Sequence, residues 1–415
     1  MSTPLTGKLL ALAAEVEDNL KQQVLTQWFP RAVDPSGGFH QNYAEDWSRL
    51  PGGERSVVYQ SRLTWLASQA AERFPEHSKA YLSYARHGFH CLQDTLWDPK
   101  NGGFFWAVDG AAGKPVRGGE KSVYGVSFAI YALASLYKAS KDEAALTLAH
   151  SAFAWLQAHS HDAVHGGWRE SLTRQGEPID GAGNDPIGTV YGRKSMNTHI
   201  HLLESLTALC EARPSRVARE SLLEVFLVVR DKVAVESAGY LNLFFTPDWK
   251  VVLGHDSYGH DVETAFLLIE AAAVLGMPRD ERTWALARRI TDHALKFGWD
   301  TRHGGFYDSG EVLGLPISRD KIWWVQAEGL NALLLMDGKF GHETSRYWDA
   351  FLRQWEFIQT HQVDHKYGGW LSEVSENGER LPGRVKSDSW TECYHQGRAL
   401  LTVSAALRAR AKRLG

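Results

Sequence analysis

A turn built from Asp, Gly-Gly and an aromatic residue recurs along the chain at nearly constant spacing. It reads DPSGGF at 34–39, DPKNGGF at 98–104, DAVHGGW at 162–168, DTRHGGF at 300–306 and DHKYGGW at 364–370. A degenerate copy, SAGYLNLFF, lies at 237–245, and successive copies are 64 to 72 residues apart. A fixed period of this length indicates one supersecondary unit repeated six times. The period also crosses every place where a domain boundary could fall.

Between the turns, apolar residues recur at helical spacing. One strongly apolar helix per unit is predicted over 56–74, 122–140, 195–212, 258–276, 322–336 and 389–409. A more charged, amphipathic helix follows in each unit, such as 279–298. Helices that are apolar on nearly every side are typical of elements buried on both sides. The pattern therefore predicts an all-α fold, an (α/α)6 barrel with short β-hairpins at one end, as a single catalytic domain over 1–415.

Composition excludes several classes of protein. The formal net charge is -4 and acids and bases are interspersed, so no basic face for nucleic acid is expected. Cys91, Cys210 and Cys393 show no C-x-x-C spacing, which favours a reducing compartment over a disulfide framework. The apolar run at 9–14 is followed at once by acidic residues, and no stretch approaches transmembrane length. We expect a cytoplasmic protein, monomer or homodimer, with no membrane or nucleic-acid partner.

Polar and aromatic side chains stand in the first two turns of the six predicted inner helices, where a purely structural core would carry Leu and Ala. Burying such groups is costly unless they are paired or face a wet site, so we expect them to converge on one cavity. They are Arg62, Tyr124, Asn197, His199, His201, His260, Glu263, Trp323, Trp324, Glu328, Trp390 and His395.

Spacing suggests how some of these groups pair. His260 and Glu263 are i, i+3 neighbours, so Glu263 is expected to hold the imidazole and raise its pKa. A salt bridge between Arg62 and Glu263 is a purely structural alternative. His199 and His201 point to different helix faces, so only one should reach the cavity. Two histidines with Glu263 could hold a metal, but no H-E-x-x-H or close ligand cluster occurs, and no metal is expected.

Four motifs carry a resemblance to a known family. They are MNTHIHLLE (196–204), YGHDVETAFLL (258–268), WWVQAEGLNAL (323–333) and WTECYHQGRALL (390–401), with SVYGVSFAIYAL (122–133) in support. Together they resemble the N-acylglucosamine 2-epimerase superfamily over essentially the whole chain, and they look most like its cellobiose 2-epimerase, mannose isomerase and mannose 2-epimerase branches. The resemblance implies an (α/α)6 barrel and a sugar substrate. The nucleotide site of the animal acylglucosamine members has no recognisable signature here.

The resemblance also assigns roles. It implies that His260 and His395 form the acid/base pair and that His201 is the third functional histidine. Glu263 is assigned to the catalytic set together with these three histidines. Glu328 is assigned to the sugar-binding set because of its position on its helix. The family's remaining sugar-binding positions fall on Arg62, Tyr124, Asn197, Trp323 and Trp390. The tryptophan assignment within 323–324 is open by one residue, as is the role of His199. No cofactor is implied.

The implied reaction removes the C2 proton of an opened aldose to give an enediolate, a task suited to neutral histidine. Inversion at C2 would make the enzyme an epimerase that interconverts aldoses of the mannose and glucose type. Transfer of the proton to C1 would make it an aldose-ketose isomerase that uses the same residues. The flanks VVYQSRLTW (57–65) and WTECYH (390–395) favour a free monosaccharide over cellobiose. A glycoside hydrolase would need two facing carboxylates. Glu263, Glu328 and Asp388 are available, but histidines dominate the predicted cavity, which also argues against a non-catalytic sugar binder.

Overall fold

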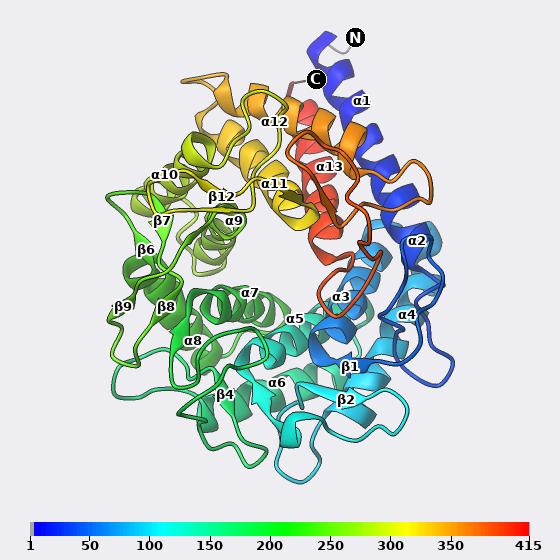
Figure 1. Ribbon diagram of the computed structural model, residues 1–415, viewed down its shortest axis with the longest axis vertical. Coiled ribbons are helices and arrows are strands. Elements are labelled where there is room, and N and C mark those ends of the chain that lie inside the picture. The colour runs from blue at the N-terminus through cyan, green and yellow to red at the C-terminus, as the bar shows by residue number, and fades with distance from the viewer. Residues whose placement is uncertain (1–3, 415) are drawn as a thin grey trace.

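Two concentric rings of antiparallel helices form the body of the molecule (Figure 1). The computed structural model describes residues 4–414, and the statements below refer to that part of the chain. The inner helices are α3 (Val57–Arg73), α5 (Val123–Ser140), α7 (Met196–Ala212), α9 (Tyr258–Val274), α11 (Trp323–Phe340) and α13 (Tyr394–Leu414). The outer helices are α1 (Pro4–Asn19), α4 (Ser78–Cys91), α6 (Glu143–His159), α8 (Arg216–Val228), α10 (Glu281–Phe297) and α12 (Arg346–Phe357). The predicted (α/α)6 barrel is confirmed.

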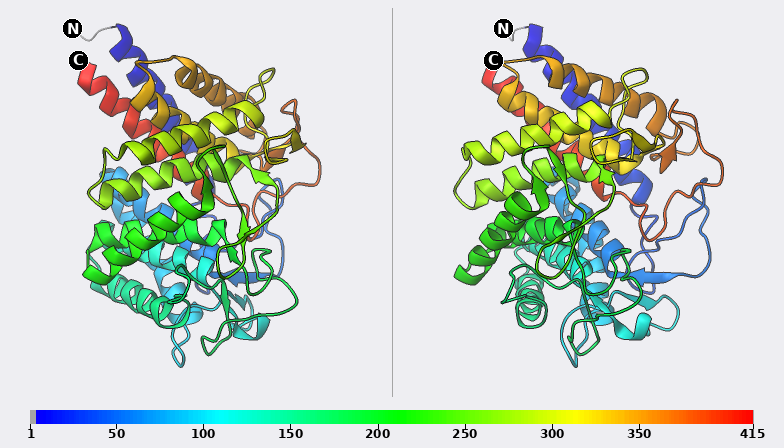
Figure 2. Two further views of the ribbon diagram at one scale, coloured as in Figure 1. Left: turned by 90° about the vertical axis from the view of Figure 1, so that its left-hand side faces the viewer. Right: turned by 60° about the vertical axis from the view of Figure 1, so that its left-hand side comes forward.

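The rings close through contacts between neighbouring helices. Each inner helix packs against the next, and α13 packs back against α3. Each outer helix packs mainly on one inner helix. Helix α1 lies against α13, which brings the two ends of the described chain together (Figure 2). A short helix α2 (Thr26–Trp28) follows α1. Every inner helix is thereby flanked by two others of the same ring.

Burial explains why the two rings differ in sequence. In α5 the residues from Val123 to Ile130 are buried without interruption, because the helix has neighbours on all sides. In α10 burial is confined to one stripe that includes Leu286, Ile290 and Ala294 at i, i+4 spacing. Within residues 4–414, no helix combines the length and the apolar character needed to cross a membrane.

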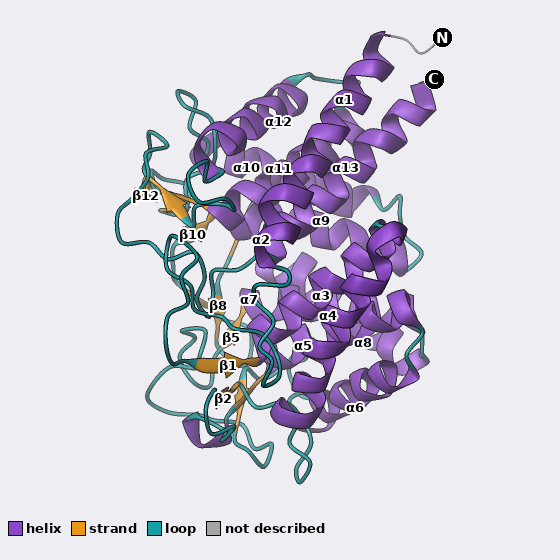
Figure 3. Cartoon of the chain, turned by 90° about the vertical axis from the view of Figure 1, so that its right-hand side faces the viewer, coloured by secondary structure: helices purple, strands orange, loops and turns teal. Residues whose placement is uncertain are grey.

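Short antiparallel strands gather at one end of the barrel, the end at which all inner helices begin (Figure 3). Two-stranded ladders pair β1 with β2, β3 with β4, β6 with β7 and β13 with β14, and three-stranded sheets run β5-β8-β9 and β10-β11-β12. Their bounds are β1 Glu54–Ser56, β2 Ala107–Asp109, β3 Lys121–Ser122, β4 Ser171–Leu172, β5 Lys194–Ser195, β6 Ala234–Val235, β7 Tyr240–Leu241, β8 Phe244–Phe245, β9 Val251–Val252, β10 Asp256–Ser257, β11 Ser309–Gly310, β12 Pro316–Ser318, β13 Lys321–Ile322 and β14 Glu373–Val374.

The recurrent Gly-Gly turn follows each outer helix and leads the chain back toward the next inner helix. Gly103 has φ 72°, and a Cβ atom there would lie 2.7 Å from the Trp155 ring. Both the left-handed backbone and the close approach therefore require glycine at this position. The equivalent Gly305 has φ 83° and lies against Phe357 in the same way.

A buried ion pair that the sequence analysis did not anticipate fastens these turns to the inner helices. Lys321, two residues before α11, bonds through Nζ to Asp300 Oδ2 at 2.8 Å and to the Gly304 carbonyl at 2.6 Å. The same clamp recurs as Lys121 with Asp98, Lys194 with Asp162 and Lys386 with Asp364. In the fourth unit, whose turn is degenerate, Asp256 takes the lysine position and pairs with His293.

The last inner helix differs from its prediction. It begins at Tyr394 rather than at Ser389, because the Asp388 carboxylate accepts the backbone N–H groups of Trp390 and Thr391 and turns the chain. Trp390 consequently lies in the loop before α13, not on the helix as expected.

Candidate active site

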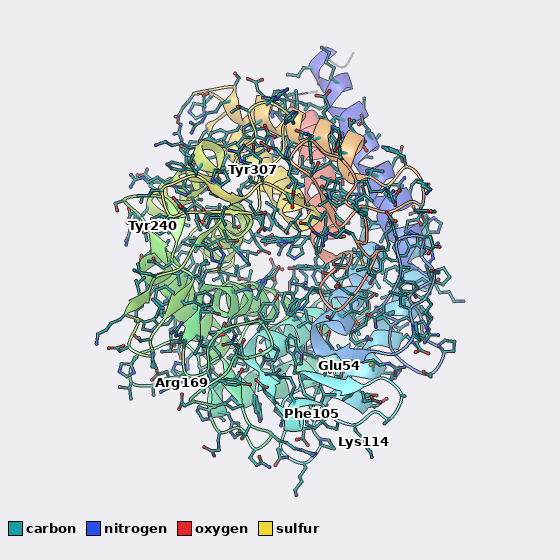
Figure 4. All side chains as sticks on the ribbon, viewed as in Figure 1. Glu54, Phe105, Lys114, Arg169, Tyr240 and Tyr307 are labelled. Carbon is teal, nitrogen blue, oxygen red and sulfur yellow. The ribbon has the colours of Figure 1, made fainter. Side chains whose placement is uncertain are left out.

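A cavity of about 230 Å³ opens at the strand-bearing end of the barrel. Its lining comes from the first two turns of all six inner helices and from two loop residues. The lining residues are Arg62, Tyr124, Ile187, Asn197, His201, His260, Glu263, Trp323, Trp324, Trp390 and His395. Figure 4 shows the ring in the same view as Figure 1. The labelled residues Glu54, Phe105 and Tyr240 lie around the middle of the ring and not in it. Every predicted site residue except Glu328 lies on the cavity wall.

His201 projects from α7 between two aromatic rings. Its ring centroid is 5.1 Å from that of Tyr124 and 4.6 Å from that of Phe128. Its Nδ1 atom lies 3.0 Å from Oε2 of Glu204, one turn further along the helix. Because an ionised carboxylate can only accept, the neutral tautomer that fits this contact has its proton on Nδ1 and its lone pair on Nε2.

His199 faces the opposite way and holds the hairpin end of the fold. Its Nδ1 donates to the carbonyl of Ser195, and its Nε2 accepts the Trp168 amide N–H at 3.1 Å. Burial lowers the pKa of His199 to about 3, so the ring is neutral. The position is thus structural: it ties α7 to the third Gly-Gly turn.

His260 lies at the start of α9 with its Nδ1 atom 2.7 Å from Ser257 Oγ. Burial lowers its pKa to about 4, and the nearby Glu263 only partly opposes that shift. The expectation that Glu263 would hold this imidazole is wrong, because the Glu263 carboxylate bonds instead to Arg398. Its charge does raise the pKa of His260 as expected, but burial lowers that pKa by more. A neutral His260 therefore faces the cavity.

His395 lies on α13 and is held by a carboxylate from α11. Its Nδ1 is 2.7 Å from Oε1 of Glu328. Glu328 is fully buried behind His395 and does not reach the cavity, contrary to its predicted place in the sugar-binding set. Burial lowers the pKa of His395 well below its ordinary value, although the charge of Glu263 opposes the shift. The pair leaves Nε2 of His395 as an unprotonated base.

The Trp324 ring lies between the two histidines. Its centroid is 4.8 Å from that of His260 and 5.4 Å from that of His395. Both Trp323 and Trp324 line the cavity, which resolves the one-residue ambiguity of the sequence analysis by placing both on the wall. Trp390 is 38% exposed and stands at the mouth, near Trp106 and Tyr124.

Arg62 enters the cavity from α3 with its charge already balanced. Its guanidinium donates to Glu392 Oε1 at 2.9 Å and to the Tyr124 hydroxyl at 3.1 Å, and it stacks over Phe128. The alternative salt bridge between Arg62 and Glu263 is not formed. Sequence analysis did not single out Glu392, although it lies within the WTECYH motif. The residue stands in the loop before α13, where helical spacing gives no signal.

One lining residue, Ile187, was not predicted from the sequence. Ile187 reaches the cavity from the irregular loop between β4 and β5, where no periodic pattern could reveal it. Asn197 lines the wall with a buried Oδ1 that has no hydrogen-bond partner. An unpartnered acceptor on a cavity wall suits a hydroxyl-rich ligand.

Glu263, Glu328 and His395 lie close enough together to share one metal ion. Arg398, however, already donates to Oε1 of both glutamates, so a guanidinium occupies the position of a cation between them. A divalent ion there would face a buried like charge, and this donor set does not fit a metal.

Known proteins resemble this chain in sequence and fold. The sequence matches the family model for N-acylglucosamine 2-epimerase over residues 37–407. A cellobiose 2-epimerase of Bacteroides fragilis is 29% identical over 397 residues, which cover 94% of this chain and 98% of the relative. A D-mannose isomerase of Marinomonas mediterranea is 25% identical over 412 residues, covering 95% and 96%. The solved structure of cellobiose 2-epimerase from Spirochaeta thermophila is 31% identical with a TM-score of 0.87, covering 98% of this chain and 99% of that one.

Proposed function

We propose that this chain, which belongs to the N-acylglucosamine 2-epimerase family, is an isomerase that interconverts the C2 epimers of an aldose. The observation that carries the proposal is a pair of neutral histidines, His260 and His395, on the wall of one cavity. Each has its Nδ1 atom engaged by a neighbour, which leaves Nε2 available for substrate. Two such groups can serve the two faces of one carbon.

In the proposed reaction His395 removes the proton from C2 of the open-chain aldehyde. Its carboxylate partner Glu328 stabilises the imidazolium that forms, as a carboxylate does in a catalytic triad. The resulting enediolate is negatively charged, which favours the protonated form of His260 in a poorly solvated cavity. His260 then returns a solvent-derived proton to the opposite face of C2. Its contribution is general acid catalysis.

The charge that develops on O1 and O2 requires preorganised donors. Arg62 is a fixed cation on the wall, and its stacking and ion pair hold it in place before substrate arrives. Asn197 on α7 can donate from its side-chain amide toward the same oxygens, and the unprotonated Nε2 of His201 can accept a hydrogen bond from a sugar hydroxyl. Such stabilisation acts only on the transition state and so raises turnover.

Aldose-ketose isomerisation is the second candidate, favoured by the D-mannose isomerase relatives. If His395 alone exchanges the proton, returning it to C1 instead of C2, the product is a ketose. The substrate class in either case is an aldohexose of the mannose and glucose type, free or as the reducing end of a β-1,4-linked disaccharide. The exposed Trp390 at the mouth suits stacking of a sugar ring.

One experiment separates these outcomes. The enzyme is incubated in D₂O with mannose, glucose, fructose and cellobiose, and the products are followed by NMR. Glucose from mannose with deuterium at C2 identifies the epimerase, whereas fructose labelled at C1 identifies the isomerase. Release of free reducing ends from oligosaccharide would identify a hydrolase. Tight binding without exchange into any sugar would contradict an enediolate mechanism and favour a binding protein.

We also propose a cytoplasmic location and a monomeric or homodimeric state. The three cysteines are free and buried, in keeping with a reducing compartment. Cell fractionation tests the location, and light scattering coupled to gel filtration tests the oligomeric state.

A further inference from the structure

One guanidinium lies behind the wall of the active-site cavity and joins α13 to three other inner helices. Arg398, on α13 one turn after His395, donates to Oε1 of Glu204 on α7, Glu263 on α9 and Glu328 on α11. The distance to Glu328 is 2.6 Å, and all four side chains are at most 3% exposed. Arg398 itself does not line the active-site cavity.

Two of these carboxylates hold the histidines of the site. Glu204 bonds to His201 Nδ1 at 3.0 Å, and Glu328 bonds to His395 Nδ1 at 2.7 Å. An ionised carboxylate accepts a hydrogen bond from Nδ1–H and so leaves Nε2 of a neutral ring unprotonated, whereas a protonated carboxyl can donate a hydrogen bond to Nδ1 and force the ring proton onto Nε2. The ionisation of the two glutamates therefore decides whether Nε2 of each ring carries a proton.

From this arrangement we propose that Arg398 is a positioning residue that fixes the tautomers of His201 and His395 through Glu204 and Glu328. The inference rests on the proposed function of the same site. Electrostatics support it. Although burial acts to raise it, the pKa of Glu204 is lowered to about 2 by Arg398 and His201. Burial raises the pKa of Glu328, and Arg398 opposes that rise. Without the guanidinium both carboxyls shift toward their protonated forms.

The titratable groups facing Arg398 come from five inner helices. They are Tyr131 on α5, Glu204 on α7, Glu263 and Glu270 on α9, Glu328 on α11 and Tyr394 on α13. These acids outnumber Arg398, so its removal leaves the buried carboxylates of Glu204 and Glu328 without the guanidinium to which they are bonded, and protonation is the least costly response.

A second cavity, of about 180 Å³, reaches Arg398 from the opposite end of the barrel. Glu204 and Arg398 lie at its buried end, and Lys138 and Glu211 form a more exposed part of its lining. A truncated side chain at 398 would extend this cavity, so a small cation could enter without passing through the active site.

The test is chemical rescue of R398A by guanidinium at low millimolar concentration. Turnover is expected to fall about 10²-fold or more, on the scale of losing a fixed histidine tautomer. The acid limb of kcat/KM should move to higher pH, and guanidinium should reverse both changes while isosteric, neutral urea does not. R398K, which keeps the charge, should retain the wild-type acid limb. R410A is the matched control, because Arg410 lies on the same helix and pairs with Asp337 outside the site.

A second readout does not depend on turnover. In protein with ¹⁵N-labelled histidine, NMR reports which ring nitrogen is protonated. Wild type should show Nδ1-protonated His201 and His395, and R398A should show Nε2-protonated rings in a protein with unchanged circular dichroism. Unchanged tautomers in folded R398A, or equal rescue by urea, would overturn the proposal. Absence of exchange in the D₂O experiment with the expected tautomers present would count against the proposed function alone.

Discussion

At the residue scale, the acid/base histidines are neutral because they are buried. The pKa of His260 is lowered to about 4 and that of His395 falls well below its usual range. A base must be unprotonated, so kcat/KM should stay constant as the pH falls from 7 past 6.5. It should decrease only at lower pH, where the histidines take up protons. An acid limb at or above pH 6.5 in the pH profile of mannose conversion would contradict this assignment.

Neighbouring histidines on α7 should respond differently to truncation. His201→Ala removes a cavity group and should lower kcat, whereas His199→Ala removes two buried hydrogen bonds and should lower stability by about 1–3 kcal/mol with near-normal kcat. His260→Ala and His395→Ala should each cost about 10²- to 10⁴-fold in kcat. Steady-state kinetics and thermal melts on the four variants check the pattern. The reverse order for His199 and His201 would exchange their roles.

At the element scale, the lysine clamps fasten the turns to the helices. Lys321→Met should destabilise the fold by about 3–5 kcal/mol, because it breaks a buried ion pair and leaves the Asp300 carboxylate with the His303 ring and two backbone N–H groups but no lysine. The matched control is Lys250→Met, whose side chain is 80% exposed and which should change stability by at most about 0.5 kcal/mol. Urea unfolding measures both. Equal effects of the two substitutions would show that the clamp contributes no stability.

The inner helices and their cavity residues were predictable because helical phase repeats. Arg62, His260 and His395 stand at similar phases in different units, so one rule located them all. The partners Glu204 and Glu392 do not recur at one helical phase. Each is placed by a contact with one particular side chain, His201 for Glu204 and Arg62 for Glu392. Ile187 comes from an irregular loop, and the start of α13 depends on one carboxylate, Asp388, turning the chain. These features arise from tertiary contacts that spacing along one segment does not encode.

At the scale of the whole molecule, six helices supply one site whose arginines and glutamates are paired with one another. Arg62 neutralises Glu392, and Arg398 occupies the gap where a metal would otherwise bind between Glu263 and Glu328. We therefore expect full activity after exhaustive EDTA treatment, measured as mannose conversion before and after dialysis. Loss of turnover that Mn²⁺, Mg²⁺ or Zn²⁺ restores would contradict a mechanism based on histidines alone.

The closure of the ring by α13 has a consequence for synthesis on the ribosome. Helix α13 carries His395, packs against both α1 and α3, and is the last helix of the described chain to leave the exit tunnel. A nascent chain that lacks it has an open ring with unburied apolar edges and neither His395 nor Arg398. Sugar chemistry therefore begins only after α13 has been synthesised, and until then helix α1 lacks the inner helix against which it packs.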